Sequence, residues 1–502
     1  MSNPLPASSI RTVIAASSVG TMIEWYDFYI FGMLAKTIST QFFPEGNATA
    51  ALLSTLAIFA AGFIVRPFGA LVFGRLGDLV GRKYTFLVTL VLMGGSTFLI
   101  GLVPSYKSIG IAAPLIVLLL RLVQGLALGG EYGGAATYVA EHSPDNKRGY
   151  FTSWIQTTAT LGLFVALGVI MVVKLNMSDE AFNRDWGGWR YPFWVSIFLV
   201  AVSVYIRLRM SESPLFSKLK SEGKTSANPL KESFSHKANF KMVLLALFGA
   251  VMGQGVIWYT GQFYAQSFLE TKCNIEFEQS RTILLWAIAF ATPFFLFFGW
   301  LSDKIGRKWI MMTGMLLGII TYRPIFNTFL EDSKVDNWKK NASVVTSQPL
   351  ADIKDNSGTN AVTPMLYVLS DGSSFVGETP ASDQELNKPP LYKEKHLSSA
   401  TYWKFVFLVF VLILYVTMVY GPIAAFLVEM FPTKIRYTSM SLPYHIGNGV
   451  FGGLVPFIGL LLTTTYPQDP LVGLWYPIGV AALCLVIGTI YLRNKIDKDV
   501  TD

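Results

Sequence analysis

Long apolar stretches alternate with short polar segments along the whole chain. Each stretch holds about the 20 mostly apolar residues that an α-helix needs to cross a bilayer. They are rich in Gly, Ala, Leu, Val and Phe, and they are too long for buried strands. The pattern predicts twelve membrane-spanning helices, at residues 11–35, 48–73, 84–103, 111–139, 150–174, 190–208, 241–269, 282–300, 308–329, 402–428, 438–464 and 471–492.

The composition agrees with a membrane protein and excludes several other classes. Of the 502 residues, 52% are hydrophobic and only 14% are charged, where a soluble protein carries about 25% charged residues. The two cysteines lie in different segments, and only four histidines are present, which leaves no pattern for a metal or redox pair. We therefore expect no enzyme, no cofactor and no nucleic-acid partner.

The charge distribution predicts the orientation in the membrane. The net charge is +8, and most Lys and Arg residues fall in alternate loops, as they do when those loops face the cytoplasm. Both termini are then expected in the cytoplasm. The largest cytoplasmic segment, 209–240, is predicted to link an N-terminal six-helix bundle, 1–208, to a C-terminal one, 241–502.

One long polar segment, residues 330–401, interrupts the second half and is expected on the outer side. Within it, the sequence MLYVLSDGSSFV at 365–376 is typical of a strand, a turn and a second strand. A small, partly folded insert and a flexible loop both remain open at this point.

Two motifs occur once in each half. The sequence G-x-L-x-D-x-x-G-R-K occurs at 74–83 and at 299–308, each time between the second and third helices of a half. The sequence E-x-x-P-x-x-x-R occurs at 141–148 and at 429–436, each time after the fourth helix. The repeat predicts two parallel six-helix units, an organisation typical of transporters that bind their solute between the halves.

The charged residues of these motifs are candidates for a cytoplasmic gate. Carboxylates can accept hydrogen bonds from amides at helix ends, and arginines can reach carboxylates. We expect such contacts to hold the cytoplasmic side closed and to break when it opens; the alternative is that they only fix the loops. The candidate gate residues are Asp78, Arg82, Glu141, Arg148, Asp303, Arg307, Glu429 and Arg436.

With these motifs the chain resembles the major facilitator superfamily and, within it, the metabolite:proton symporter family. The segments that carry the resemblance are GTMIEWYDFYIFG at 20–32, RPFGALVFGRLGD at 66–78, RLVQGLALGGEYGG at 121–134, SESPLF at 211–216 and EMFPTKIR at 429–436. That family includes permeases for 2-oxoglutarate, citrate, shikimate, proline and betaine. The resemblance implies an all-α fold of twelve helices and secondary transport driven by a proton gradient. The insert at 330–401 is not typical of the family, and this chain lacks the long C-terminal coiled coil of the osmolyte-sensing member.

Ionisable residues at bilayer depth are costly and usually functional. Five of them fall in the first half: Glu24, Asp27, Arg66, Arg121 and Glu131. In similar proton-coupled sugar porters, a helix-1 acid pairs with the helix-4 Arg of this motif, so the resemblance assigns proton coupling to Asp27 and Arg121. Protonation of Asp27 would then free Arg121; the alternative is a static ion pair that aligns two helices.

The remaining three charges have less defined roles. Glu24 lies one turn before Asp27, where it can relay protons or hydrogen-bond a neighbour. Arg66 and Glu131 lie at similar depth, which predicts a second ion pair and gives Glu131 a possible part in coupling. If Arg66 is unpaired instead, its planar fork suits a substrate carboxylate.

The resemblance also implies that helices 1, 4, 7 and 10 line the solute site. Gln254, Trp258 and Gln262 share one face of the seventh helix because they are spaced by four residues. With Arg66, Gln124 and Tyr415 they are the predicted substrate contacts. The alternative for the aromatic residues is a place in the core or in the interfacial belt.

The expected function is proton-coupled symport of a small organic acid, such as a di- or tricarboxylate, 2-oxoglutarate or a shikimate-like acid. The alternatives are transport of a zwitterionic osmolyte or a sugar, and a sensor that uses the outer insert. We expect a monomer in the plasma (inner) membrane whose partners are the solute, protons and the lipid bilayer.

Overall fold

The computed structural model describes residues 7–44, 46, 48–208, 217, 220–223, 226–350, 364–378 and 391–494. Ten helices or fused helices in this part are long and apolar enough to cross a membrane. Helices α1 (Ala7–Met33) and α5 (Arg82–Ile100) complete the twelve predicted spans. The prediction of an all-α membrane fold is therefore confirmed.

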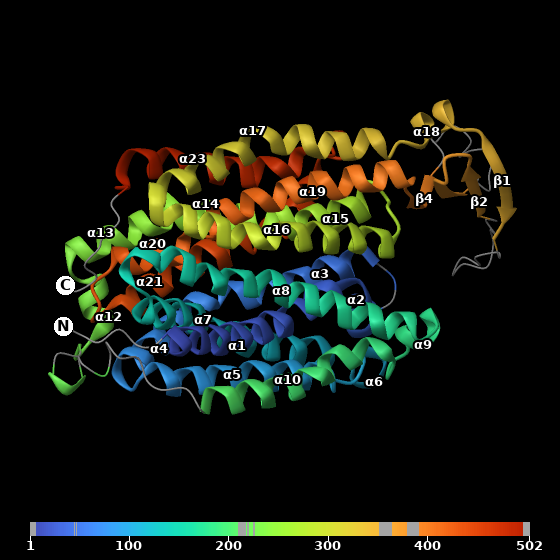
Figure 1. Cartoon of the computed structure of the whole chain (residues 1–502). Coiled ribbons are helices and arrows are strands. Elements are labelled where there is room, and N and C mark those ends of the chain that lie inside the picture. The colour runs from blue at the N-terminus through green and yellow to red at the C-terminus, as the bar shows by residue number, and fades with distance from the viewer. Residues whose placement is uncertain are drawn as a thin grey trace.

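The first six spans form one half of the helix bundle. They continue from α1 through α3 (Ala48–Ile64) and α4 (Arg66–Leu79), α5, α7 (Ala112–His142), α8 (Arg148–Leu175) and α10 (Tyr191–Leu208). Short helices α2 (Ala35–Phe42), α6 (Tyr106–Ile109) and α9 (Asp179–Asn183) connect them at one end. Figure 1 shows this half, from blue to green, in the lower part of the view.

The second half uses more interrupted helices. Its spans are α13 (Lys237–Ala246) to α15 (Ala265–Thr271), α16 (Phe277–Ile305), α17 (Lys308–Asp332), α19 (Ser399–Tyr420) with α20 (Ile423–Met430), α21 (Arg436–His445) with α22 (Val455–Thr465), and α23 (Trp475–Tyr491). Three π-helical stretches, η3 (Leu247–Val251), η4 (Thr260–Tyr264) and η5 (Ile446–Gly452), lie inside two of these spans. Single-turn π-helices are often found at functional sites, and the middle segment α14 (Met252–Tyr259) lies between two of them.

The repeated motif ends a helix at the same place in each half. Gly81 follows α4 with φ of 137°, and Gly306 follows α16 with φ of 93°. Residues that carry a Cβ atom rarely adopt these backbone angles. Glycine therefore allows the chain to turn directly from one span into the next.

The segment between α17 and α19 contains a folded domain in its described part. After α18 (Val335–Asn341), strands β1 (Val344–Pro349), β2 (Met365–Leu369), β3 (Ser374–Glu378) and β4 (Leu391–His396) form an antiparallel sheet in the order β1-β2-β3-β4. The predicted strand–turn–strand at 365–376 is confirmed as the β2–β3 hairpin. Gly372 turns this hairpin with φ of 81°.

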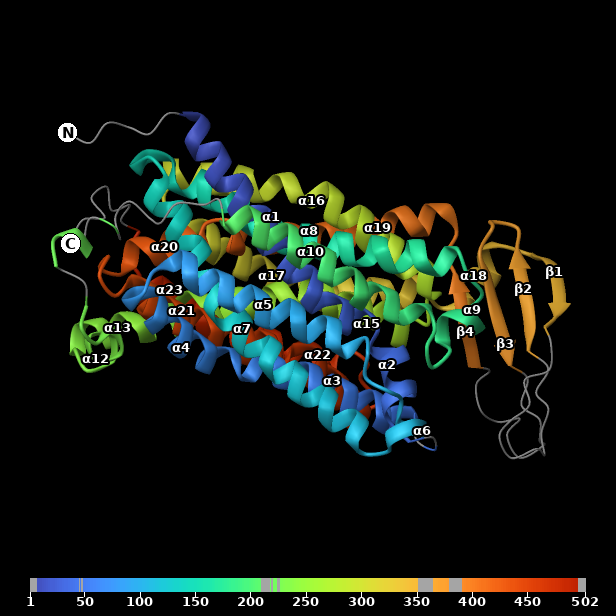
Figure 2. The ribbon, with the colours of Figure 1, turned by 90° about the horizontal axis from the view of Figure 1, so that it is seen from below.

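The sheet lies at one end of the bundle, and the start of α1 and the end of α23 lie at the other (Figure 2). We call these the sheet end and the terminal end. Large apolar side chains face outward between them, such as Phe198, which is 72% exposed. Such exposed apolar surface suits contact with lipid.

Candidate functional site

A cluster of aromatic side chains joins the two halves near the middle of the bundle. The ring centroid of Trp258 on α14 lies 5.7 Å from that of Trp25 and 5.9 Å from that of Tyr29, both on α1. The rings of Tyr132 on α7 and Tyr444 on α21 are stacked with centroids 3.6 Å apart. These residues are all buried, so the centre is closed to water in this conformation.

Arg66 lies within this cluster as a buried cation. It begins α4, and its guanidinium carbon is 4.3 Å from the ring centroid of Phe28 and 4.1 Å from that of Phe63. Its Nε and Nη2 atoms have no hydrogen-bond partner among the described residues. Tyr259 and Tyr444 from the other half are close enough to interact with it electrostatically. The guanidinium thus faces tyrosines across the interface.

The predicted Arg66–Glu131 ion pair is not formed. Glu131 Oε2 accepts a hydrogen bond of 2.6 Å from Thr89 Oγ1 on α5. The cause is the packing of α4 on α7: a Cβ added at Gly129 would lie 2.2 Å from the carbonyl oxygen of Arg66. The two backbones touch there, and the Glu131 side chain points towards α5. This leaves the second interpretation of Arg66, a cation without a carboxylate partner.

The predicted direct pair between Asp27 and Arg121 is also not formed in this conformation. Arg121 Nη1 donates instead to Gln124 Oε1 at 2.5 Å. Gln124 Nε2 in turn donates to Thr97 Oγ1 at 2.6 Å and to the backbone oxygen of Asp27 at 3.2 Å. Gln124, one turn after Arg121, therefore takes the place that the carboxylate was predicted to hold.

The carboxylate of Asp27 is buried, and the hydroxyl of Ser196 on α10 is the side-chain group that interacts with it. Its Oδ2 atom lies 3.3 Å from the position that a Cβ on Gly94 of α5 would take. Glu24, one turn earlier on α1, is buried as well. Both acids thus lie deep in the first half, as predicted.

The seventh span supplies polar atoms without partners. Gln254 Oε1 accepts from Asn448 Nδ2 at 2.8 Å, but Gln254 Nε2, Trp258 Nε1 and both side-chain polar atoms of Gln262 have no partner in the described part of the chain. Buried polar groups are normally satisfied. These atoms are therefore available to a ligand at the centre.

Tyr415 does not belong to this centre. Its hydroxyl accepts a hydrogen bond of 3.2 Å from Thr321 on α17, on the side of α19 away from the cluster. Tyr420 takes its place: its hydroxyl lies 2.8 Å from that of Tyr444, and its ring centroid is 6.4 Å from that of Trp258. Five residues turn a helix by about 140°, so Tyr415 and Tyr420 face different neighbours.

The sequence prediction missed several members of the cluster: Trp25, Tyr29, Tyr132 and Tyr444. Trp25 and Tyr29 are spaced by four residues on α1, beside the predicted acids. That spacing was the available signal, because side chains four residues apart share a helix face.

The charged motif residues hold the halves together at the terminal end. Asp303 on α16 accepts hydrogen bonds of 2.8 Å from the backbone nitrogens of Gly149 and Tyr150, in the first turn of α8. Asp78 on α4 accepts from the backbone nitrogen of Thr438, in the first turn of α21, at 3.2 Å. Each acid thus caps a helix of the opposite half, where the partial positive charge of the helix end favours it.

Arginine–carboxylate pairs surround these caps. Arg307 makes two hydrogen bonds to Glu429, of 2.6 and 2.7 Å, and one of 3.1 Å to Asp303. Two longer pairs cross between the halves, Arg148 to Glu429 and Arg436 to Glu141, each at 3.4 Å. The side chain of Arg82 lies outside the described residues. We call the crossing contacts of Asp78, Asp303, Glu429 and Glu141 the terminal latch.

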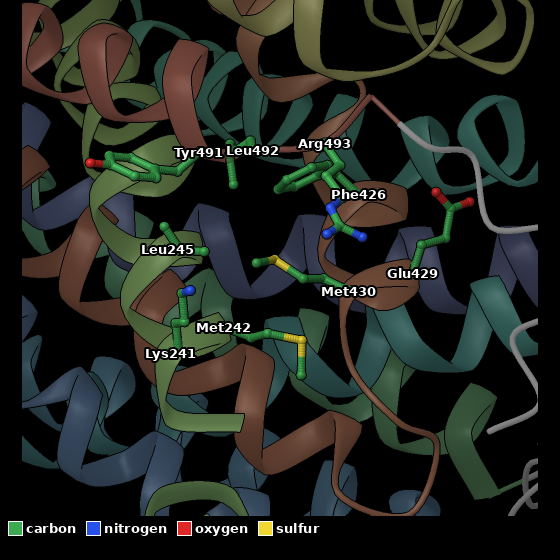
Figure 3. Close-up of a pocket in the computed structure, with 9 residues that line it drawn as sticks. All are labelled: Lys241, Met242, Leu245, Phe426, Glu429, Met430, Tyr491, Leu492 and Arg493. Carbon is green, nitrogen blue, oxygen red and sulfur yellow. The ribbon is translucent and has the colours of Figure 1, made fainter. Parts of the chain in front are cut away.

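A cavity of about 440 Å³ lies beside the latch, between α13, α20 and the end of α23 (Figure 3). Glu429 borders it together with the basic residues Lys241 and Arg493. The rest of its wall is largely apolar. The terminal end therefore has room next to the latch, within the C-terminal half.

Comparison with known proteins identifies the family. A family model described as sugar (and other) transporter matches residues 12–347. The chain belongs to this family, which is part of the major facilitator superfamily. It is thus a multi-pass membrane transporter and not an enzyme, as the sequence predicted.

Curated relatives differ in what their names say they carry. An inner membrane metabolite transport protein of Escherichia coli K12, YhjE, is 32% identical over 96% of this chain and 94% of its own length. A proline/betaine transporter of the same strain is 34% identical over 63% of this chain and 64% of its own. An alpha-ketoglutarate permease, also from that strain, is 28% identical over 97% of this chain and 94% of its own.

A solved structure shares the fold of this transporter. The proton:xylose symporter XylE bound to 6-bromo-6-deoxy-D-glucose superposes with a TM-score of 0.63 over 97% of each chain, at 16% identity.

Proposed function

We propose that this transporter imports a small organic acid together with protons by alternating access. The observation that carries the proposal is Arg66, a buried arginine without a carboxylate partner that faces tyrosines of the opposite half. A guanidinium binds a carboxylate with two parallel hydrogen bonds, which suits a planar acid group. The relative named alpha-ketoglutarate permease supports this substrate class.

Proton coupling is assigned to the first half. Asp27 is the proposed proton carrier, since it is a buried acid that forms no ion pair within the described residues. Arg121 and Gln124 link it to the aromatic centre through the backbone of α1. Glu24 and Glu131 are the proposed alternates in the proton path.

We place the transporter in the inner membrane, with both termini in the cytoplasm and the sheet end outside. The excess of basic residues in the loops at the terminal end supports this orientation, and a relative named an inner membrane protein supports the location. The terminal latch is then the proposed cytoplasmic gate. The proton gradient serves as the energy source, without a cofactor, and the proposed transport unit is a monomer.

A zwitterionic osmolyte is the second candidate. The rings of Trp25, Tyr29 and Trp258 gather at the interface, and aromatic faces bind quaternary ammonium groups. The relative named proline/betaine transporter favours the same candidate.

Uptake into proteoliposomes with an inward proton gradient tests the substrate. The panel holds 2-oxoglutarate, citrate, shikimate, proline and betaine. We expect gradient-driven uptake of one of the acids, with a KM raised about tenfold or more by Arg66→Lys, because lysine cannot reproduce the two-pronged contact. Uptake of betaine or proline alone would establish the second candidate instead.

The same assay tests the proton carrier. We expect Asp27→Asn to abolish acceleration by the gradient while exchange of solute across the membrane continues, since exchange needs no proton transfer. Coupled uptake that persists in Asp27→Asn would move the proton site to Glu24 or Glu131.

A further inference from the structure

A cavity of about 490 Å³ lies at the sheet end, where the strand domain meets the helices of the second half. Figure 1 shows this region, with β4 and α18 beside the ends of α15 and α17. The charged residues of its wall are Lys272, Arg323, Glu331, Lys334, Lys395 and Asp469. They come from four separate segments, one of which is β4 of the strand domain.

The two acids of the wall are already engaged by two of the four cations. Glu331 pairs with Lys334 at 2.6 Å, and Asp469 pairs with Arg323 at 3.5 Å. Lys272 and Lys395 have no carboxylate within 4.0 Å in the described part of the chain. The wall therefore carries two positive charges that its own acids do not balance.

Lys395 is held in place by backbone contacts beside Lys272. The nitrogen of Lys395 donates to the oxygen of Asn274 at 2.9 Å, and its oxygen accepts from the nitrogen of Glu276 at 2.9 Å. This short bridge fixes β4 to the loop that follows Lys272. Lys395 Nζ also donates to the carbonyl oxygen of Ser333 at 2.9 Å, which sets the direction of the side chain.

Burial makes the two charges costly when the cavity holds only water. Lys395 is 8% exposed, and burial lowers the pKa of both Lys395 and Lys272 below the usual range for lysine. A negative charge within the cavity would offset this cost, because an opposite charge nearby favours the protonated amine.

We propose that this cavity binds a small dianion, a dicarboxylate or a phosphate, whose two negative charges match Lys272 and Lys395. Two charges of the ligand against two unbalanced cations leave the site close to neutral. The site lies wholly in the second half and shares no residue with the centre around Arg66. It therefore does not depend on which solute the transporter carries.

The first test uses the purified full chain in detergent, with 2-oxoglutarate and inorganic phosphate as separate probes. Lys272 is half-buried and open to acetylating reagents, so its modification can be followed by mass spectrometry. We expect either probe to protect Lys272 while the exposed Lys340 on α18 reacts as before. The probe that protects more strongly identifies the kind of dianion. Equal reaction of Lys272 with and without both probes would overturn the proposal.

The second test compares binding affinities by calorimetry. In Lys272→Gln we expect the Kd of the protecting dianion at this site to rise about tenfold, as one charge-assisted contact is lost. Lys340→Gln removes the same charge from the same end of the protein and should leave the Kd unchanged. An unchanged Kd in Lys272→Gln would exclude the site. The same measurements in a protein that also carries Arg66→Gln exclude binding at the centre. The proposed dianion site and the proposed solute site can then be tested independently.

Discussion

Arg66 and Arg121 are two buried cations with different surroundings. Arg121 hydrogen-bonds to Gln124 and lies over the ring of Phe28 at 3.9 Å, so it is partly satisfied within its own half. Arg66 has aromatic faces around it, and its Nε and Nη2 atoms, like those of Arg121, have no described partner. Arg66 differs in that it faces tyrosines of the opposite half. A buried donor without a partner costs stability, and a bound ligand can repay that cost. The unpartnered polar atoms at the centre are thus placed where a bound solute would satisfy them.

Gln262 gives a direct measure of this arrangement. Both polar atoms of its side chain are unpartnered among the described residues, and the residue is fully buried. Gln262→Met keeps the shape and removes the buried amide, so we expect the ligand-free protein to gain about 1 kcal/mol and its melting temperature to rise by a few degrees.

The affinity for the solute should fall in the same variant if the amide binds it. Gln266→Met, one turn further along, is the matched control: Gln266 Nε2 donates to Glu270 at 3.2 Å and only Oε1 is unpartnered, so loss of this hydrogen bond should offset any gain in stability. A lower melting temperature for Gln262→Met would show that its amide is satisfied within the protein.

At the scale of elements, glycines let the helices of the first half approach closely. A Cβ on Gly125 of α7 would lie 2.0 Å from the backbone oxygen of Gly62, and one on Gly69 would lie 2.0 Å from that of Leu126. Small residues at such contacts are the usual means of helix association in membranes. The glycine-rich stretch of α7 is therefore a packing seam.

We expect Gly125→Ala to lower the melting temperature by several degrees, because overpacking costs about 1–3 kcal/mol and backbone cannot move aside easily. Gly168→Ala on α8 is the control, since a Cβ there would meet nothing within 4 Å. Melting temperatures of the two variants are measured by heating samples and quantifying the remaining folded protein by size-exclusion chromatography. Similar melting curves for both variants would contradict the role of Gly125 in close helix packing.

The sequence predicted the elements well because span length and charge bias are direct consequences of the bilayer. It predicted the β2–β3 hairpin because the pattern and the turn residues are local. It did not predict β1 and β4, whose pairing depends on distant partners, nor the π-helical stretches of α13 to α15. At the site, Tyr415 was predicted in place of Tyr420. The almost uniformly apolar sequence of α19 does not determine which of its faces is turned towards the centre. Arg121 likewise contacts Gln124 and not Asp27, because the packing of the helices decides which side chain lies beside it.

For the molecule as a whole, the terminal latch is the proposed gate at the terminal end. Its contacts repeat in both halves, since Asp303 caps α8 and Asp78 caps α21. Glu429 is 5% exposed at its side chain and joins Arg307 and Arg148, which come from opposite halves. Breaking a buried ion pair by removing one partner typically costs about 3–5 kcal/mol.

We therefore expect Glu429→Gln to shift the population towards conformations open at the terminal end. Spin labels at Asn146→Cys and Lys304→Cys, both exposed and in opposite halves, report the opening as a longer distance. The native cysteines, Cys273 and Cys484, are buried and should not label. Glu331→Gln at the sheet end is the control. An unchanged distance distribution in Glu429→Gln would contradict a gating role.

The close contact of α4 with α7 has a consequence for the order of events in a transport cycle. The backbone of Arg66 is clamped against Gly129, so this cation travels with the first half, while Tyr259, Tyr420 and Tyr444 travel with the second. An acid held between them is pulled from both sides whenever the halves swing apart. Charge-assisted bonds are about twice as strong as neutral ones, so the tyrosine contacts give way first. In the proposed transport cycle, an acid solute therefore stays with the first half and dissociates from Arg66 last.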